Sequence, residues 1–381
     1  MTRTNVAGSK RPRKRQPRLP DRTSRSRQDP LPPGSATVRA QSPAALLAIV
    51  PHLLGFMPES SLVVVGIRSP DGEVRVSLRY DLPSAGDADV VNDIARHALA
   101  VLAAQGLTAS MAIGYGPDSL VRPLMEALGT AASPRDIELT ECLRMHDGRY
   151  WSYTCGDEQC CPAAGVPFDP ADHPAAVALA AASRATLASR AALAASIAPI
   201  GGIAAESMRE ATQRAERHVT QVLAKVRKSH RIGAARHMIS SEGLAAVSRL
   251  IATYRAGEKY QTEYELAWLT VALRDLRVRD DAWARMDPRF REEHRRLWTD
   301  VVRRARPGYV AAPASLLAFV AWQAGNGALA NVALDRALAD DREYSMAALL
   351  RDVIAAGTPP EMARLPMTPE EVAAEYEVQA G

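Results

Sequence analysis

The chain has 381 residues, with 47 lysines and arginines, 43 aspartates and glutamates, eight histidines and four cysteines. This length suffices for two domains of ordinary size, and 47% hydrophobic residues can form a sizeable core. These values exclude a collagen, a mucin and a disulfide-stapled mini-protein. The 69 alanines predict helices that pack closely through small side chains.

The net charge of +4 is unevenly distributed. Residues 1–30 contain ten basic and two acidic residues, whereas the remainder contains 37 basic and 41 acidic residues. Residues 1–42 lack apolar periodicity, so we expect a disordered basic tail. A flexible polycation predicts weak, salt-sensitive contact with nucleic acid or an anionic membrane surface. The alternative is that the tail only solvates the end of the chain.

Several features predict a cytoplasmic bacterial protein. No apolar stretch follows the N-terminal charges, so we expect no secretory signal. The longest charge-free run is interrupted by proline and glycine, and therefore does not predict a transmembrane segment. Clustered cysteines differ from the framework of a secreted protein. Arginine outnumbers lysine 42 to 5, which together with the alanine content is typical of a GC-rich bacterial genome.

The first half of the chain predicts an α/β fold. Ser42 and Pro43 are a predicted N-cap and first helical position, and Gly55 is a predicted helix end. Apolar runs and turn residues predict two hairpins, and helical periodicity occurs between them. The predicted helices are 44–54, 89–104 and 118–128, and the predicted strands are 61–67, 74–80, 110–115, 137–145 and 149–153. Together they indicate a mixed β-sheet with flanking helices.

After Pro174 the pattern predicts an all-α region. Expected helices are 175–187, 189–196, 204–226, 241–256, 263–278, 288–304, 313–324, 329–340 and 344–356. We interpret the region as an irregular helical bundle with one tetratricopeptide-like helix pair near its end, because no second copy of the repeat is found. Thr368 and Glu371 form a predicted capping box. The predicted organisation is a disordered basic tail at 1–42, an α/β domain at 43–174, an α-helical domain at 175–360 and a C-terminal extension at 361–381.

Three stretches resemble a known family. They are Leu46–Ile67 (LLAIVPHLLGFMPESSLVVVGI), Arg149–Pro162 (RYWSYTCGDEQCCP) and Gly325–Pro360. Together they resemble the uncharacterised actinobacterial family called domain of unknown function 4192, over about residues 42–360. The resemblance implies a bacterial cytoplasmic protein. The family has no established activity, so it transfers no catalytic residues to this chain.

The cysteine-rich loop is the most unusual local feature. Cys155, Cys160 and Cys161 offer thiol ligands, and His146 is a candidate fourth ligand for zinc, with Cys142 and His173 as other options. Adjacent cysteines normally point in different directions, which argues against a metal site. A disulfide is disfavoured in a reducing compartment. The remaining alternative is a loop of small, half-buried thiols.

Other candidate motifs are weaker. Gly114-Tyr115-Gly116 follows a predicted strand, as a phosphate-binding loop would, but Pro117 removes an amide donor and Asp118 repels anions. Arg289–Arg306 contains seven arginines with interleaved acidic residues, which favours a solvated, salt-bridged helix face over a nucleic-acid contact. No nucleophile-elbow, Walker or zinc-protease motif occurs, so no catalytic residue is assigned.

These features support two interpretations of the function. The interpretation that we favour is a non-catalytic cytoplasmic binding or regulatory module for a protein segment or small ligand, with Trp298 and Trp322 as candidate anchors. The alternative is a metalloprotein or thiol-dependent enzyme that uses the Cys155–Cys161 loop with His146 and Asp147. The alternative requires these groups to converge in one pocket.

Overall fold

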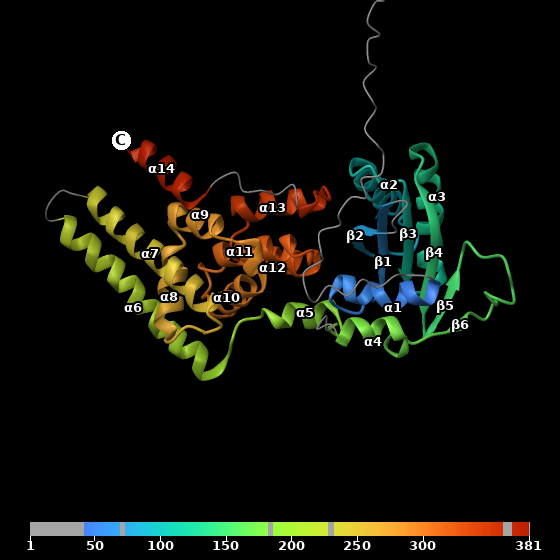
Figure 1. Ribbon diagram of the computed structural model, residues 1–381, viewed down its shortest axis with the longest axis horizontal. Coiled ribbons are helices and arrows are strands. Elements are labelled where there is room, and N and C mark those ends of the chain that lie inside the picture. The colour runs from blue at the N-terminus through green and yellow to red at the C-terminus, as the bar shows by residue number, and fades with distance from the viewer. Residues whose placement is uncertain (1–41, 69–72, 182–185, 228–231, 361–367, 381) are drawn as a thin grey trace, which may run out of the picture. The chain divides into compact units, whose positions relative to one another are not determined.

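The structure is a computed structural model, and its described residues are 42–68, 73–181, 186–227, 232–360 and 368–380 (Figure 1). They lie within one compact unit, Ala36–Gly381. Apart from Ser42, the predicted basic tail falls outside the described residues, and so do residues 69–72, which connect the strands of the first predicted hairpin. Within the described part of the chain, no helix is both long enough and apolar enough to cross a membrane.

The first half contains a six-stranded mixed sheet. Its strands are β1 (Ser61–Arg68), β2 (Glu73–Asp81), β3 (Ala109–Tyr115), β4 (Glu138–His146), β5 (Arg149–Ser152) and β6 (Val166–Pro167). The spatial order is β2-β1-β3-β4-β5-β6. Only the β3–β4 pair is parallel, and the other neighbours are antiparallel. Both predicted hairpins and the predicted mixed sheet are therefore confirmed.

Two helices cover one face of the sheet, and a separate hydrophobic core lies between them and that face. They are α2 (Ala88–Ala104) and α3 (Asp118–Ala132), which pack against each other (Figure 1). Alternate strand residues point toward them, because successive side chains in a strand face opposite sides. We call this cluster the sheet core; its fully buried members include Leu62, Val64, Leu99, Leu102, Val121, Leu124 and Leu128.

The opposite face belongs to a second core. Helix α1 (Pro43–Leu54) covers it and packs against α4 (Pro174–Ala181). Ser42 Oγ accepts a hydrogen bond from Ala45 N at 3.1 Å, and Gly55 ends α1 with φ 79°. Val63, Val65 and Ile67 of β1 join a cluster that continues into the helices of the second half. We call this cluster the shared core.

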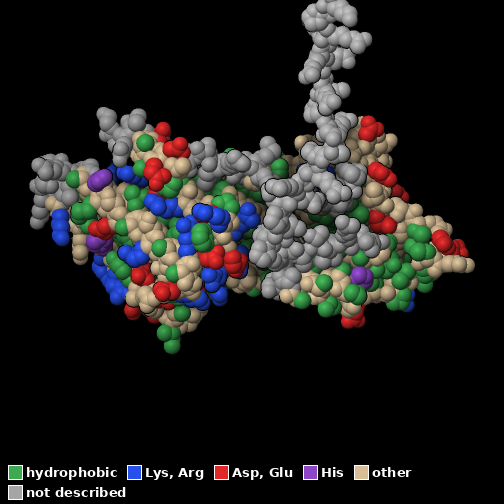
Figure 2. Space-filling model, viewed as in Figure 1, with side chains coloured by type: hydrophobic (Ala, Val, Ile, Leu, Met, Phe, Trp, Pro, Cys, Tyr) green, Lys and Arg blue, Asp and Glu red, His purple; other side chains and the backbone are tan. Residues whose placement is uncertain are grey.

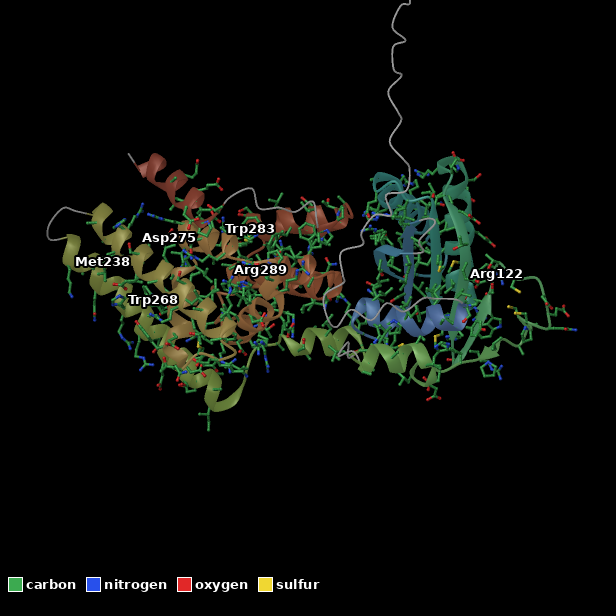
Figure 3. The ribbon with its side chains drawn as sticks, viewed as in Figure 1. Arg122, Met238, Trp268, Asp275, Trp283 and Arg289 are labelled. Carbon is green, nitrogen blue, oxygen red and sulfur yellow. The ribbon has the colours of Figure 1, made fainter. Side chains whose placement is uncertain are left out.

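The second half is helical, as predicted. Its elements are α5 (Arg190–Ser196), α6 (Gly202–Arg227), α7 (Ile232–Arg255), α8 (Glu263–Ala272), α9 (Leu276–Ala284), α10 (Arg291–Arg304), α11 (Ala311–Gln323), α12 (Gly327–Asp340), α13 (Ser345–Ala355) and α14 (Pro369–Ala380). Thr368 N donates to Glu371 Oε2 at 2.7 Å and Thr368 Oγ1 accepts from Glu371 N at 3.3 Å, so the predicted capping box is present. Figure 3 shows Trp268 and Trp283 among these helices.

Several predicted elements differ from the observed ones. The helix predicted at 263–278 is two helices, because Asp275 Oδ1 accepts from Arg277 N at 3.0 Å and begins α9. The helix predicted at 175–187 does not include Leu187, which instead forms an isolated parallel bridge with Phe56. The helix predicted at 288–304 begins with a separate 3-10 turn, and the two-residue strand β6 was not predicted.

The tetratricopeptide-like helix pair is not confirmed. Helices α11 and α12 do pack against each other. However, every residue of α11 from Ala311 to Trp322 is buried, so this helix lies inside the bundle on all sides. A helix of a solenoid repeat keeps one face at the surface. The irregular helical bundle is therefore the description that fits.

Candidate functional site

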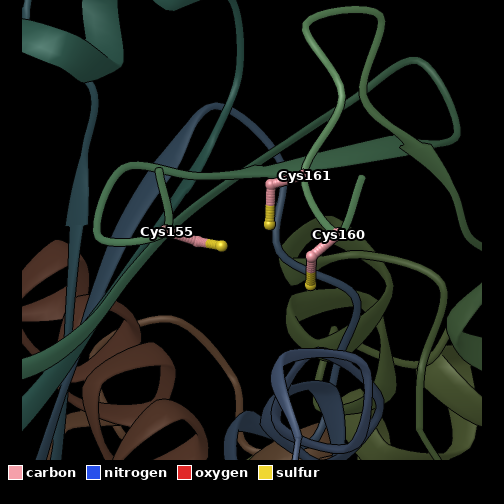
Figure 4. Close-up of side chains that lie close together, drawn as sticks. All are labelled: Cys155, Cys160 and Cys161. Carbon is pink, nitrogen blue, oxygen red and sulfur yellow. The ribbon is translucent and has the colours of Figure 1, made fainter. Parts of the chain in front are cut away.

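The three clustered cysteines lie in the segment between β5 and β6 (Figure 4). Their Sγ atoms all lie within 4.8 Å of one another. Cys160 is exposed, whereas Cys155 and Cys161 are partly buried, and all three are free thiols. Among the described residues, this is the one group of histidine, cysteine and acidic ligand atoms that is close enough to hold a metal ion. The cluster can therefore bind a metal.

Local hydrogen bonds fold the loop so that the thiols meet. Cys161 N donates to the carbonyl oxygen of Asp157 at 2.7 Å, and Gln159 N donates to Asp157 Oδ1 at 2.9 Å. These bonds close a tight turn that returns Cys161 toward Cys155. Cys155 N donates to Ser152 Oγ at 3.1 Å, which fixes the start of the turn. The adjacent cysteines, expected to point apart, both contribute sulfur atoms to the cluster.

The thiols titrate differently because their surroundings differ. Hydrogen bonds from the Asp157 backbone amide, and then from the Cys161 and Cys160 thiols, lower the pKa of Cys155. Burial, followed by the interactions with Cys155 and Cys160, raises the pKa of Cys161 to about 12. Of Cys155 and Cys161, Cys155 is therefore the one that deprotonates first as the pH rises.

The other candidate ligands occupy different environments. His146 is the last residue of β4, its Nε2 lies 3.4 Å from Asp147 Oδ2, and it is not a member of the cluster. Cys142 is buried against the sheet core, and burial raises its pKa to about 11. His173 Nδ1 accepts from Ala175 N at 3.1 Å at the start of α4. The structure thus brings together the three cysteines, without His146.

The glycine-containing segment between β3 and α3 allows close packing of the strand against the helix. A Cβ at Gly114 would lie 2.2 Å from Val121 Cγ1. Asp118, at the first position of α3, accepts hydrogen bonds from Arg122 Nε at 2.8 Å and Tyr153 Oη at 2.7 Å. The hydrogen bond from Arg122, and then that from Tyr153, lowers the pKa of Asp118. A carboxylate therefore fills the position where a phosphate would need to bind.

The arginine-rich segment forms ion pairs with its own neighbours. Arg289 pairs with Asp287 at 2.7 Å, and Arg304 pairs with Asp300 at 3.3 Å. Figure 2 shows basic and acidic side chains interspersed over the helical region, and Figure 3 places Arg289 there. This arrangement agrees with a solvated, salt-bridged face. Trp298, one of the expected anchors, is completely buried in the shared core.

A cavity that the sequence did not reveal lies against β2 and helices α12 and α13. Its volume is about 510 Å³. Strand β2 is the edge of the sheet and lines the cavity over residues 75–81, with Arg75, Ser77 and Arg79 among them. The apolar part of its wall contains Trp322, the second expected anchor, together with Phe56 and other apolar residues: Leu53, Leu54 and Ile354.

Charged groups of the cavity form ion pairs and hydrogen bonds with one another. Asp335 Oδ2 accepts from Arg190 at 2.6 Å, and its Oδ1 accepts from Arg351 at 2.7 Å. Arg79 donates to Ser61 Oγ at 2.9 Å and pairs with Asp81 at 2.6 Å. Each guanidinium group is thus oriented by an acceptor, which reduces the entropy that a ligand would have to remove.

One wall of the cavity also carries a tyrosine–histidine pair. Tyr80 Oη lies 2.7 Å from His97 Nδ1, and their rings meet edge to face at 5.8 Å. Burial raises the pKa of Tyr80 well above its usual value, so the phenol keeps its proton. On the β2 wall, Ser77 Oγ is buried and has no hydrogen-bond partner among the described residues.

Comparison with known proteins identifies a family. The model of the domain of unknown function (DUF4192) matches residues 43–361, which is most of the chain. The chain belongs to this family. The predicted family resemblance is therefore confirmed. No curated protein and no solved structure matches the chain.

The DUF4192 domain contains both the thiol cluster and the cavity. The cysteines were recognisable because they are close in sequence. The cavity residues come from strands and helices far apart in the chain, so no local motif marks them. The available signal was the polar alternation of Arg75, Ser77 and Arg79 along β2, which reads equally well as a solvent-exposed strand face.

Proposed function

We propose that this DUF4192 domain is a non-catalytic binding module whose ligand is a small molecule with an anionic group and an apolar body. The observation that carries the proposal is the excess of arginine in the cavity. Among the described residues of its lining, the three arginines Arg79, Arg190 and Arg351 are accompanied by two acidic residues, Asp81 and Asp335. Asp335 accepts from two guanidinium groups and can neutralise the charge of only one.

A partly enclosed excess of positive charge favours an anion. Guanidinium groups form charge-assisted hydrogen bonds with carboxylates and phosphates, which are about twice as strong as neutral hydrogen bonds. Ser77 adds a hydroxyl that has no partner among the described residues. A ligand oxygen near β2 would satisfy it, which supports a ligand with several acceptor atoms.

The apolar wall supports a ligand with a hydrophobic part. Trp322 and Phe56 are almost completely buried and border the same cavity as the arginines. The cavity volume of about 510 Å³ falls within the range of small-molecule sites, roughly 300–1,000 Å³. Such sites combine an apolar lining with a few placed polar groups, as this one does.

Calorimetric titration with phenyl phosphate, inorganic phosphate and phenol tests the proposal. We expect phenyl phosphate to bind most tightly, with an affinity that falls as salt is added, because the probe combines both chemical features. Arg351→Gln should weaken its binding about tenfold or more, since a charge-assisted hydrogen bond is lost.

Arg342→Gln is the matched control, because it removes the same charge from an exposed residue outside the cavity lining. It should leave the affinity unchanged. Equal affinities for Arg351→Gln and the control would contradict an anion site in this cavity, as would the absence of binding by all three probes.

We further propose that the protein acts in the cytoplasm. All four cysteines are free thiols, and three of them lie close enough together to oxidise readily. Such a cluster persists in a reducing compartment.

A further inference from the structure

We propose that Cys155, Cys160 and Cys161 form a three-thiolate site for a thiophilic metal ion, with zinc as the expected occupant. The proposal is independent of the cavity and rests on the convergence of three sulfur atoms from one short loop. Their mutual distances of at most 4.8 Å approach the ~3.8 Å that separates sulfur ligands around a tetrahedral zinc ion.

The loop has the properties of a metal-binding turn. Its backbone is held at both ends of the cysteine run, by Ser152 at Cys155 N and by the Asp157 carbonyl at Cys161 N. Figure 4 shows the three side chains close together, with Cys155 pointing toward the other two. Closure around an ion therefore needs small side-chain adjustments and no refolding of the loop.

The donor set selects the chemical class of the ion. Thiolates are soft ligands, which favour zinc or copper(I) over magnesium or calcium. On binding, three S–H bonds give three metal–sulfur bonds, and the three protons pass to solvent, so no oxidant or reductant is required. Three protein ligands leave one tetrahedral position open to water or an added ligand, the arrangement of reactive zinc sites.

Titration of the full-length, reduced protein with Cd²⁺ and then Zn²⁺ tests the site. We expect one Cd²⁺ per chain, with the ultraviolet charge-transfer absorption of cadmium–thiolate bonds, and loss of that signal only at a large excess of Zn²⁺, because thiolates bind the softer Cd²⁺ more tightly. Cys160→Ser should weaken binding roughly a hundredfold or more, because a direct ligand is lost. Cys160 is exposed, so this variant is expected to fold normally.

Two control variants distinguish the three-thiolate site from other arrangements. His146→Ala should bind Cd²⁺ as tightly as the wild type, because His146 lies outside the cluster. Cys142→Ala should also retain binding, with circular dichroism to verify its fold. Absence of binding by the wild type, undiminished binding by Cys160→Ser, or an equal loss in His146→Ala would each overturn the proposal. Phenyl phosphate binding by Cys160→Ser reports on the cavity separately.

Discussion

The two faces of the six-stranded sheet differ in how they are buried. One face, with Leu62 and Val64, packs against α2 and α3 in the sheet core. The other, with Val63 and Val65, joins the shared core that extends through α1 into the second half. Neighbouring residues of β1 thus belong to different cores. The comparison shows that the α/β region has one face completed by its own helices and one face that depends on the helical region.

Matched leucine substitutions should give the largest effects and the sharpest test of this difference. Leu124 lies in the sheet core and Leu317 in the shared core, and both are fully buried. We expect each change to alanine to lower the free energy of unfolding by about 2–5 kcal/mol. Hydrogen exchange measured by mass spectrometry should rise chiefly in α2 and α3 for Leu124→Ala.

For Leu317→Ala, exchange should rise in α10–α12 and in α1 together. An identical exchange pattern for the two variants would contradict the division into two cores. Urea unfolding curves provide the change in stability for each variant.

The helical region should also carry a pH dependence. His294 on α10 is buried, and its Nε2 accepts from Arg255 at 3.1 Å and from Asp287 N at 3.3 Å. Burial, with a further contribution from Arg255, lowers its pKa to about 4. In the unfolded chain His294 therefore binds a proton below about pH 6.5, whereas in the folded chain it binds one only when the pH falls to about 4. Stability should fall by about 2 kcal/mol between pH 7 and about pH 5.

His294→Gln keeps an acceptor but cannot titrate, so it should flatten the dependence of Tm on pH in this window. His237→Gln, at an exposed position of α7, is the control and should leave the slope in place. Asp287 titrates in a separate pH range, because its pKa is lowered to about 2. Its protonation therefore lowers the stability of the protein only as the pH falls below about 4. A slope unchanged by His294→Gln would contradict the assignment.

A smaller effect is expected within the sheet core at Gly114. A Cβ there would lie 2.2 Å from Val121 Cγ1. Gly114→Ala should therefore lower the free energy of unfolding by about 1–3 kcal/mol through overpacking. The double variant Gly114→Ala/Val121→Ala should lose less stability than the sum of the losses in the two single variants, because Val121→Ala removes the clash. Gly129→Ala has open space around it in α3 and should stabilise the protein by about 0.5–1 kcal/mol. Thermal unfolding measures all four variants.

The sequence predicted the elements well where periodicity and caps agree. Helix α1 was recognisable from Ser42 and Gly55, and the strands from β-branched runs. The break between α8 and α9 was missed because the apolar pattern continues across it, although Asp275 is a normal cap residue. Strand β6 was beyond prediction, because two residues become a strand only through pairing with β5.

The candidate site was predictable only in its local part. Three cysteines within seven consecutive residues are visible as a group in the sequence, because such a segment spans at most about 20 Å and a single turn brings them together. In contrast, Arg190, Asp335 and Arg351 meet only after α5, α12 and α13 have packed. A site of this kind has no characteristic spacing of residues in the sequence, because its geometry is set by the packing of elements far apart in the chain.

The central claim is that the cavity binds a small anion with an apolar body. Of the five tryptophans, only Trp322 lines this cavity, so fluorine NMR of protein containing 5-fluorotryptophan locates the ligand directly. Titration with phenyl phosphate should shift one resonance, the one that disappears in Trp322→Phe, and should leave the other four in place. Four unchanged resonances and a shifted Trp322 would support the cavity as the site; an unchanged Trp322 resonance, or a larger shift at Trp151, would contradict it.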